Sequence, residues 1–526
     1  MRRPAPTTTA AALLALTVLY LSITFGSTVA GGADQYSYVT QAGLWRTGTL
    51  QIHQDIVRDS PWPGAAETWT PLGFRTIPRD PSAIASVYPP GLPLLMALFQ
   101  AVAGYCGAFL VVPLCSALTV WLTYLLGRRL FDAPHTGLVA AALVVVSPVF
   151  LYQIMNAMSD VPVTAAWTLA LVLVVSDRPW LSGLAVGAAI MIRPNLAPLA
   201  GVFVAWLALT HWRSLFRLAA GIVPGLCAVL LVNWRMYGSP LTSGYGEIGQ
   251  YYAWAYGLAN LRRYPVWLID TQTPLVLLAV CFFVVPMLLP RPRVGHLRML
   301  LGGVIGVVFL SYLFYAPFDA WWFLRFLLPM WPVMMLLSAV ALDTVARRWT
   351  GQWSTAVVWA IVAAVGWHGV RLAIDRSAFD LGWGDRRYVN VARFVAEHTE
   401  PDAVVISMQH SGSVRHYAGR LTLRYDLLDR AALDRAIAFL QSMHRRPYIV
   451  LDGDEVPIFR ARFSGRSRFG ALDWTPLATL AAPPIFVFDP LDLSRTEPPL
   501  AISTLSSRPG WRCTEPPIWP PLPRLK

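Results

Sequence analysis

The sequence predicts a polytopic α-helical membrane protein of about 11 membrane-spanning helices, followed by a C-terminal extracytoplasmic α/β domain. Composition supports this in two ways: 56% of the 526 residues are hydrophobic and only 13% are charged, whereas soluble globular proteins have roughly 25% charged residues. In addition, apolar runs of about 15–20 residues recur along the first 375 positions, a length that lets a helix cross a bilayer. A disordered chain, a collagen and a small disulfide-rich scaffold are excluded by this composition.

The apolar runs define the predicted spans. They lie at 11–30, 105–126, 137–150, 162–175, 181–192, 196–210, 215–233, 273–289, 299–316, 323–342 and 354–373. A further apolar stretch at 92–104 follows the motif Tyr88-Pro89-Pro90-Gly91 and is too short to cross a bilayer comfortably. We expect this stretch to form a re-entrant or interfacial helix.

Arginines near the ends of these runs predict the orientation of the chain. With a cytoplasmic N-terminus, the arginine-rich loops all fall on the cytoplasmic side, as the positive-inside rule requires. These arginines are Arg2, Arg3, Arg128, Arg129, Arg178, Arg213, Arg217, Arg291, Arg293, Arg298, Arg347 and Arg348. Counting 92–104 as a span would move every loop from Arg128 onward to the opposite side. We therefore expect a multi-pass protein of the inner membrane, with the loop 31–91, the Asp160 turn, the segment 239–272 and the tail 376–526 outside. The first run is long for a cleaved signal peptide, so a retained anchor is favoured.

The net charge and the cysteines limit the kinds of ligand and the kinds of cysteine site that we expect. A net charge of +13 in a soluble protein would suggest a nucleic-acid ligand, but here the positive charge lies beside apolar spans, so we expect membrane lipids and no nucleic acid. Four cysteines lie in apolar stretches and Cys513 stands alone near the end, which predicts no disulfide framework and no metal-binding Cys-x-x-Cys motif.

The tail 376–526 has the pattern of a small α/β domain with a mostly parallel sheet. Helices are predicted at 386–399 and 431–444, and strands at 403–408, 421–425, 447–451 and 485–488. The segment 410–413 is predicted to be a turn. It could bind a ligand at the end of a strand, but we favour a turn that is held only by local backbone hydrogen bonds. The acidic segment 452–455 has no EF-hand spacing, so a solvated turn is favoured over an ion site.

The first outer loop, 31–91, contains the first candidate catalytic residue. Asp34 follows the first span at the water–lipid boundary, where a carboxylate either acts on a membrane-bound substrate or merely ends the helix. The loop is long and rich in aromatic residues and proline, which is typical of a functional or a disordered segment. We expect a packed, membrane-lying structure with amphipathic pieces such as 35–46, ending at the rigid motif 88–91.

Two further charged residues lie at predicted outer helix ends. Asp160 stands in the motif 159–162, and Arg193 follows a glycine-rich apolar run. An arginine at that depth requires an anionic partner, which a lipid phosphate supplies by bidentate hydrogen bonding; the alternative is ordinary snorkelling to headgroups. The favoured interpretation of the segment 318–325 is an aromatic belt at the membrane interface. In the alternative reading, Arg325 joins Arg193 around a phosphate while the neighbouring tryptophans stack on a sugar.

Five motifs occur in an order that resembles the GT-C superfamily of integral-membrane glycosyltransferases, and in particular the protein O-mannosyltransferases and lipid A aminoarabinose transferases. They are Asp34, Tyr88-Pro89-Pro90, 124–131, 159–162 and 183–194, and they cover roughly residues 1–200. The resemblance implies a transferase that moves a sugar from a polyprenyl-phosphate donor to a lipid, glycan or protein acceptor at the outer face, with inversion at the anomeric carbon.

The resemblance also implies roles for single residues. Asp34 matches the catalytic aspartate, which would be the general base for the acceptor hydroxyl. Arg193 matches a cationic position that would stabilise the phosphate leaving group, and Asp160 matches an acid that orients the partners of Asp34 or binds an ion. Tyr88, Tyr36 and Arg325 complete the predicted substrate-binding residues.

This chain departs from the family pattern at two positions. Gln35 stands where many relatives have a second acid, and Val87-Tyr88 replace the glutamate and lysine that precede Pro-Pro in the aminoarabinose transferases. Both departures remove candidate metal ligands, so we expect no cofactor and no obligatory divalent metal.

Two other classes of function are weighed against an enzyme. A transporter or flippase of an amphipathic substrate would show two related halves with broken helices at mid-membrane, and this sequence shows no such symmetry. A scaffold for the tail would give no reason for acids and arginines to recur at outer helix ends.

Overall fold

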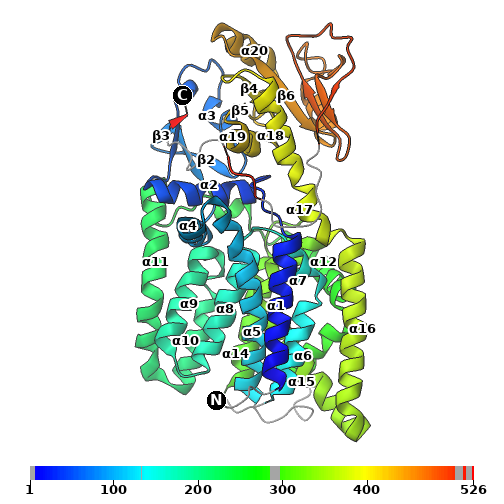
Figure 1. Cartoon of the computed structure of the whole chain (residues 1–526). Helices are drawn as coiled ribbons and strands as arrows, with labels where there is room; N and C mark the ends of the chain where they lie inside the picture. The colour runs from blue at the N-terminus through cyan, green and yellow to red at the C-terminus, as the bar shows by residue number, and fades with distance from the viewer. Residues whose placement is uncertain (1–5, 132, 285–295, 504–512, 517–523, 526) are drawn as a thin grey trace.

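The computed structural model describes residues 6–131, 133–284, 296–503, 513–516 and 524–525. Within these ranges, a bundle of helices carries two β-sheets with their short helices at one end (Figure 1). Of the predicted cytoplasmic arginines, Arg2, Arg3, Arg291 and Arg293 lie outside the described residues.

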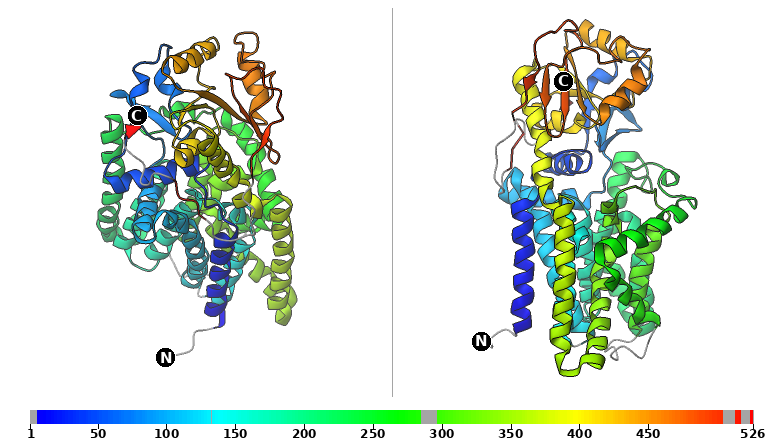
Figure 2. Two further views of the ribbon diagram at one scale, coloured as in Figure 1. Left: turned by 45° about the horizontal axis from the view of Figure 1, so that its top comes forward. Right: turned by 90° about the vertical axis from the view of Figure 1, so that its right-hand side faces the viewer.

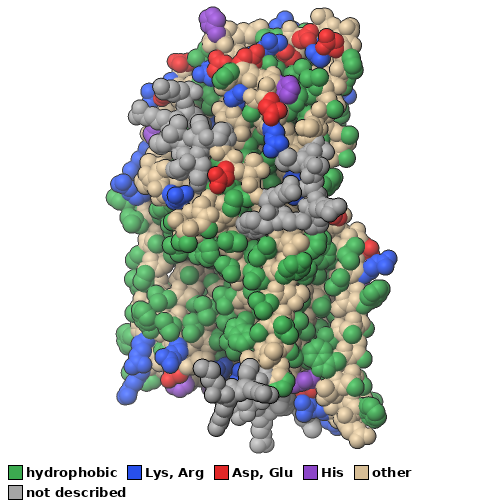
Figure 3. Space-filling model, in the orientation of Figure 1, with side chains coloured by type: hydrophobic (Ala, Val, Ile, Leu, Met, Phe, Trp, Pro, Cys, Tyr) green, Lys and Arg blue, Asp and Glu red, His purple; other side chains and the backbone are tan. Residues whose placement is uncertain are grey.

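The bundle is built from the apolar runs of the sequence. Its principal helices are α1 (Pro6–Phe25), α5 (Val111–Phe131), α6 (Pro134–Val145), α8 (Asp160–Val174), α9 (Pro179–Ile192), α10 (Leu199–Thr210), α11 (Leu215–Tyr237), α14 (Leu297–Leu313), α15 (Trp331–Thr350) and α16 (Ser354–Asp375). Among the described residues, four helical stretches are by themselves long and apolar enough to cross a membrane: Pro6–Phe25, Tyr105–Phe131, Trp212–Tyr237 and Trp321–Asp375. Figure 3 shows a broad band of hydrophobic side chains across one face of the bundle, with basic side chains below this band, at the end away from the sheets, as well as above it. The chain is thus built as an integral membrane protein.

The region after α11 differs from the prediction. The segment 239–272, expected as an outer loop, contains helix α12 (Tyr256–Gln272), and the chain then bends by 116° into the helical piece Pro274–Cys281, which continues as α13 (Leu278–Val284). Thr273 adopts a positive φ of 60° directly before Pro274, and this pair cannot continue a helix. The predicted span 273–289 therefore begins at a sharp bend, and its last residues lie outside the described ranges.

Helices α2 (Asp34–Thr47) and α4 (Gly91–Ala103) pack against each other across the end of the bundle (Figures 1 and 2). Helix α4 is the stretch 92–104, which was expected to be interfacial or re-entrant. Its outer positions Leu98 and Val102 are 60% and 85% exposed, as suits a helix that lies with one face against lipid.

The rest of the first outer loop forms a small sheet. Strands β1 (Ile52–Gln54), β2 (Phe74–Ile77) and β3 (Asp80–Ser86) are joined by the chain's last strand, β10 (Arg524–Leu525), in the order β10-β1-β3-β2. The strands of the loop pair antiparallel, whereas β10 pairs parallel with β1. The C-terminal end of the chain therefore returns to the first outer loop.

The tail forms a six-stranded sheet in the order β5-β4-β6-β8-β7-β9. Its strands are β4 (Val404–Ile406), β5 (Leu421–Leu423), β6 (Pro447–Asp452), β7 (Ala478–Leu480), β8 (Ile485–Phe488) and β9 (Leu500–Ala501). The flanking helices are α17 (Leu381–Gly384), α18 (Arg386–His398), α19 (Ser411–Ala418), α20 (Leu433–Ser442) and α21 (Glu455–Phe463). Strands β5, β4 and β6 are parallel, as predicted, but β8 is antiparallel to both β6 and β7. The sheet is mixed because β7 and β8 form a hairpin.

Two predicted turns of the tail are wrong. The segment 410–413 is the start of helix α19, and its Gly412 lies against the Tyr36 ring so closely that a Cβ would come within 2.3 Å of it. The acidic segment 452–455 is not a solvated turn, because Asp452 is paired with His410 (Nε2–Oδ1 2.7 Å) and Glu455 is 1% exposed. The carboxylate of Glu455 accepts hydrogen bonds from the backbone N–H groups of Gln409 and Asp452. These interactions supply the partners that buried carboxylates require.

The first outer loop and the tail share one hydrophobic core. Trp62 and Trp69 of the loop pack with Ile406 and Leu423 of the tail sheet. The buried Arg415 of α19 joins the two segments, since its guanidinium donates to the Gln54 side chain at 2.6 Å and to the backbone carbonyl of Trp69 at 2.5 Å. Helix α16 ends at Asp375, and the loop 31–91 packs against the tail as well as against the bundle.

A disulfide bond adds a second link at this end of the molecule. It joins Cys106 of the 3-10 helix η2 (Tyr105–Leu110), just before α5, to Cys513, with the two Cα atoms 5.8 Å apart. The expectation that Cys513 stands alone is therefore wrong. Because 407 residues separate the two cysteines, their spacing along the chain does not indicate the bond.

Candidate active site

Asp34 is the first residue of α2 and lies where the first outer loop leaves α1. The chain turns into α2 at Gly32, which adopts a φ of +58° that glycine accepts without strain. The Asp34 Oδ1 atom accepts a hydrogen bond from the Tyr88 hydroxyl. Its Oδ2 atom faces both terminal nitrogens of Arg325 at 3.4 Å. The Asp34 side chain is 26% exposed, so one part of the carboxylate is held while another part can be reached.

Tyr88 positions Asp34 from the end of the first outer loop. It stands between β3 and α4, and its ring packs on Tyr38 with ring centroids 4.6 Å apart and on Tyr245 at 5.9 Å. The rigid Pro89-Pro90 segment that follows fixes the approach of this residue to α4. Its ring is therefore held by packing, and its hydroxyl by Asp34.

Asp160 and Arg193 form the second pair of the site. Asp160 begins α8, Arg193 follows the last residue of α9, and the guanidinium Nη2 lies 2.6 Å from Asp160 Oδ1. Arg193 also donates from Nε to the Ser159 hydroxyl at 3.1 Å and from Nη1 to the Tyr312 hydroxyl at 3.4 Å. The Asp160 side chain is only 1% exposed, and a buried carboxylate is stable only when it is paired in this way.

The glycine-rich run before Arg193 has a packing role. Gly183 and Gly187 of α9 face Gly221 and Gly225 of α11, and a Cβ on Gly225 would lie 2.4 Å from the carbonyl oxygen of Gly187. Small residues at this spacing let two membrane helices approach closely. The seam fixes α9 against α11 and thereby sets the position of Arg193.

Arg325 lies between the two carboxylates. It belongs to the 3-10 helix η8 (Trp321–Met330), and its Nη1 is 3.4 Å from Asp34 Oδ2 and 3.9 Å from Asp160 Oδ2. Its guanidinium rests against the rings of Phe323 and Phe326, at 5.4 and 5.2 Å from their centroids. Two carboxylates and two guanidinium groups thus alternate in the order Asp34, Arg325, Asp160, Arg193, and we call these four residues the Asp–Arg cluster.

The structure brings together five of the six residues that the sequence predicts for the site, namely Asp34, Tyr88, Asp160, Arg193 and Arg325. Tyr36 lies elsewhere. Its ring packs on Phe74 at 5.4 Å and on His416 at 6.0 Å, where the loop meets the tail. Burial there raises the pKa of Tyr36 to about 12.

Sequence reasoning missed the aromatic wall of the site. Tyr312 at the end of α14 stacks on Phe326, with centroids 5.0 Å apart, and its hydroxyl accepts hydrogen bonds from Arg193 and Asn195. Tyr38 donates to the Ser159 hydroxyl at 3.2 Å. The recurrence of tyrosine at outer helix ends is the sequence pattern that could have indicated these residues. Trp321 and Trp322 instead pack around Tyr152.

The cluster has few features of a metal centre. In the described part of the chain, no three His, Cys, Asp or Glu side chains gather in a group that could hold a metal ion. Each carboxylate of the cluster already faces a guanidinium group.

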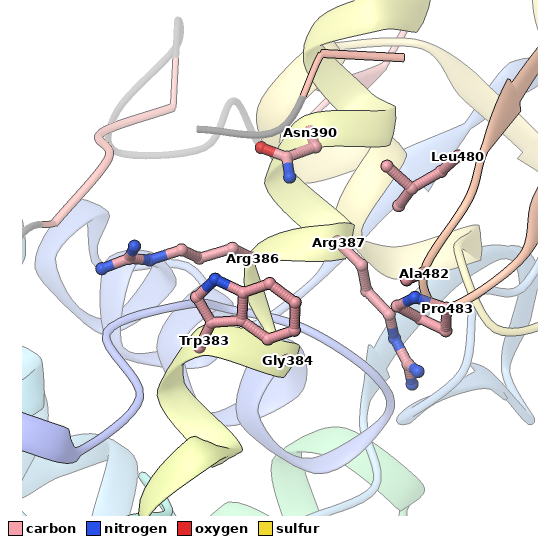
Figure 4. Close-up of a pocket in the computed structure, with 8 residues that line it drawn as sticks. All are labelled: Trp383, Gly384, Arg386, Arg387, Asn390, Leu480, Ala482 and Pro483. Atoms are coloured by element: carbon pink, nitrogen blue, oxygen red, sulfur yellow. The ribbon is translucent and has the colours of Figure 1, made fainter. Parts of the chain in front are cut away.

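A small pocket lies in the tail, between helices α17 and α18 and the β7–β8 turn (Figure 4). Trp383, Arg387 and Asn390 line it from α17 and α18, and Ala482 and Pro483 of the β7–β8 turn form the facing wall. Asp385 lies next to these lining residues in the sequence and accepts a hydrogen bond of 3.1 Å from the Gln35 side chain. Burial raises the pKa of Asp385, and the hydrogen bonds from Ser27 and Gln35 partly oppose this rise. One hydrogen bond therefore links the residue after Asp34 to the rim of the pocket.

A family model matches part of the chain. Residues 87–235 match the family of dolichyl-phosphate-mannose-protein mannosyltransferases, and this region contains Tyr88, Asp160 and Arg193. No curated protein matches the chain.

Two solved structures share the fold over most of the chain. ArnT from Cupriavidus metallidurans, bound to undecaprenyl phosphate, is 14% identical, with a TM-score of 0.54 over 92% of this chain and 98% of that one. The oligosaccharyltransferase of Archaeoglobus fulgidus, tethered to an acceptor peptide, is 13% identical, with a TM-score of 0.54 over 90% of this chain and 72% of that one. The chain therefore shares its overall fold with these two proteins, in agreement with the resemblance that the order of its sequence motifs indicates.

Proposed function

We propose that the protein is a glycosyltransferase that moves a sugar from a polyprenyl-phosphate donor to a lipid, glycan or protein acceptor at the outer membrane face. The observation that carries this proposal is the position of Asp34, a partly exposed carboxylate beside Arg325. Arg325 also faces Asp160, and Asp160 is paired with Arg193. A base for a hydroxyl group and two cations for a phosphate group thus lie side by side. The ligand named for ArnT, undecaprenyl phosphate, is a polyprenyl phosphate, the carrier that the proposed reaction would release from its donor.

In the proposed reaction, Asp34 takes the proton of the acceptor hydroxyl as the acceptor oxygen attacks the anomeric carbon of the sugar. The bond from that carbon to the phosphate oxygen breaks, and its electron pair stays on the phosphate. Attack opposite the leaving group inverts the anomeric configuration. Arg193 and Arg325 neutralise the charge that develops on the leaving phosphate.

The reaction as written needs no divalent cation, because two guanidinium groups supply the positive charge that a metal ion provides elsewhere. This proposal rests on the pairing of both carboxylates with arginine. Treatment with a chelator is expected to leave the rate of transfer unchanged.

The proposed location is the inner membrane, with the N-terminus cytoplasmic and the tail outside. The Cys106–Cys513 disulfide lies at the same end of the bundle as Asp34, and such bonds persist in oxidising compartments. Arg128, Arg178 and Arg347 lie at or just beyond helix ends on the opposite side, which the positive-inside rule makes cytoplasmic.

The proposal is tested by reconstituting the protein in vesicles with a panel of polyprenyl-phosphate-linked sugars and measuring the release of polyprenyl phosphate. We expect release from at least one donor, with sugar of inverted configuration on an acceptor, and none in empty vesicles. Movement of an intact glycolipid across the bilayer without cleavage would instead support the transporter alternative.

A further inference from the structure

We propose that Asp34 and the donor phosphate compete for Arg325, so that Arg325 serves as a shared counter-ion that passes from the base to the leaving group. This inference rests on the proposed function and assigns Arg325 a role distinct from that of Arg193.

The first argument is the charge of the Asp–Arg cluster. Its two carboxylates and two guanidinium groups balance, so that it carries no net charge before the donor binds. A sugar-linked polyprenyl phosphate is a phosphodiester and brings one negative charge. Three anions then share two cations, and one carboxylate must give up part of its pairing.

The second argument identifies which carboxylate yields. Asp160 is almost fully buried and is held by Arg193 at 2.6 Å, so leaving it unpaired would impose a large desolvation cost. Asp34 is 26% exposed, and its contacts with Arg325 are 3.4 Å long. It also keeps the hydrogen bond from Tyr88 when Arg325 moves. Asp34 is therefore the carboxylate that can lose its cation at the smaller cost.

The third argument is that Arg325 is loosely held. Its contacts with the two carboxylates, at 3.4 and 3.9 Å, exceed the 2.7–2.9 Å that is typical of charge-assisted hydrogen bonds. Its Nε atom is buried and has no hydrogen-bond partner among the described residues, and an unsatisfied buried donor is unfavourable. Its Nη1 atom donates to Met158 Sδ at 3.1 Å, and a thioether sulfur is a weak acceptor. Phe323 and Phe326 support the guanidinium without hydrogen bonds, so it can shift across their rings. Arg193, by contrast, donates to Asp160, Ser159 and Tyr312.

A shift of Arg325 would follow the movement of charge in the proposed reaction. As the acceptor hydroxyl loses its proton, Asp34 changes from −1 to 0, and the phosphate changes from −1 to −2 as its bond to the sugar breaks. Total charge is conserved while one unit moves from one side of Arg325 to the other. A cation between the two sites stabilises both ends of this movement with little rearrangement.

The test is a binding measurement that needs no turnover. The full-length protein is placed in nanodiscs of phosphatidylcholine, and the Kd for polyprenyl monophosphate is measured, with the uncharged polyprenol as the control ligand. If Asp34 competes with the phosphate, Asp34→Asn removes the competitor and should tighten binding by about tenfold or more. Asp59→Asn, the same chemical change at an exposed position of the same loop, should leave the Kd unchanged.

A double-mutant cycle isolates Arg325. Arg325→Gln should weaken binding by about tenfold, and in that background Asp34→Asn should no longer tighten it. Unfolding temperatures of all variants, together with Asp34→Ala as a second variant without the charge, separate this effect from misfolding. Equal or weaker binding by both folded Asp34 variants would overturn the inference while leaving the proposed transferase intact. Absence of phosphate-dependent binding by every protein, wild type included, would overturn the proposed function as well.

Discussion

Arg193 and Asp160 join the end of α9 to the start of α8 through an ion pair of 2.6 Å in which the carboxylate is 1% exposed. This pair serves the fold and the proposed chemistry together, and the two roles can be separated. Arg193→Ala leaves a buried carboxylate unpaired and should destabilise the protein by about 3–5 kcal/mol, as well as slow sugar transfer. The double change Arg193→Ala with Asp160→Ala removes both charges, so the unfolding temperature should recover while transfer stays slow. Recovery of transfer together with stability would show that Arg193 has only a structural role.

The glycine seam between α9 and α11 should be sensitive to added volume. Gly225→Val places a side chain against the backbone of Gly187, with the Cβ 2.4 Å from a carbonyl oxygen, and overpacking of this kind costs about 1–3 kcal/mol. Because the seam sets the position of Arg193, transfer should fall in the variant even below its unfolding temperature. Gly201→Val on α10 is the matched control, since nothing lies within 4 Å of a Cβ there. Equal transfer rates in the two variants would contradict this account of the seam.

The disulfide makes a simple prediction about thiol counts. Of the five cysteines in the sequence, Cys115, Cys227 and Cys281 are free and Cys106 is bonded to Cys513. Alkylation of the denatured, unreduced protein should therefore add three labels by mass spectrometry, and reduction should raise the number to five. Labelling of all five without reduction would also remove the support that the bond gives to an outer location.

The junction between the first outer loop and the tail should weaken in acid. Burial lowers the pKa of His416 from 6.5 to about 3, and its ring nitrogens lie 2.9 Å from the Tyr105 hydroxyl and 3.3 Å from the Thr40 hydroxyl. Between these two pKa values the unfolded chain binds the proton and the folded one does not, so the free energy of unfolding falls as the pH is lowered. At pH 5 the loss is about 2 kcal/mol.

Unfolding temperatures measured between pH 8 and pH 5 test this prediction. His416→Gln cannot take up the proton and should show a smaller fall than wild type over this range. The exposed His398→Gln should show the same fall as wild type. A fall of equal size in all three proteins would mean that His416 does not control the stability of the junction.

Much of the site could be predicted from the sequence because its charged residues stand at helix ends. Asp34, Asp160 and Arg193 each lie just outside a predicted apolar run, and alternating spans bring such ends to one side of a membrane. Helical periodicity also separates two tyrosines that the sequence leaves equivalent: Tyr38 is four residues after Asp34 and shares its face of α2, whereas Tyr36 points to the tail.

The features of the fold and the site that the sequence does not predict depend on contacts between distant segments. Local patterns do not show that Arg325 reaches Asp34 across 291 residues, or that Cys513 returns to Cys106. The segment 410–413 looks like an exposed turn because serine and glycine favour turns. Its glycine is instead needed because the ring of Tyr36, far away in the sequence, lies against it.

The most direct test of the central claim compares sugar transfer by wild type, Asp34→Asn and Asp59→Asn in vesicles that contain the same donor and acceptor. Asp34→Asn keeps the size of the side chain and removes the base, so transfer should fall by about 10²–10⁴-fold, while Asp59→Asn should match wild type and all three should share one unfolding temperature. Transfer at the wild-type rate by a folded Asp34→Asn protein would contradict the assignment of Asp34 as the general base.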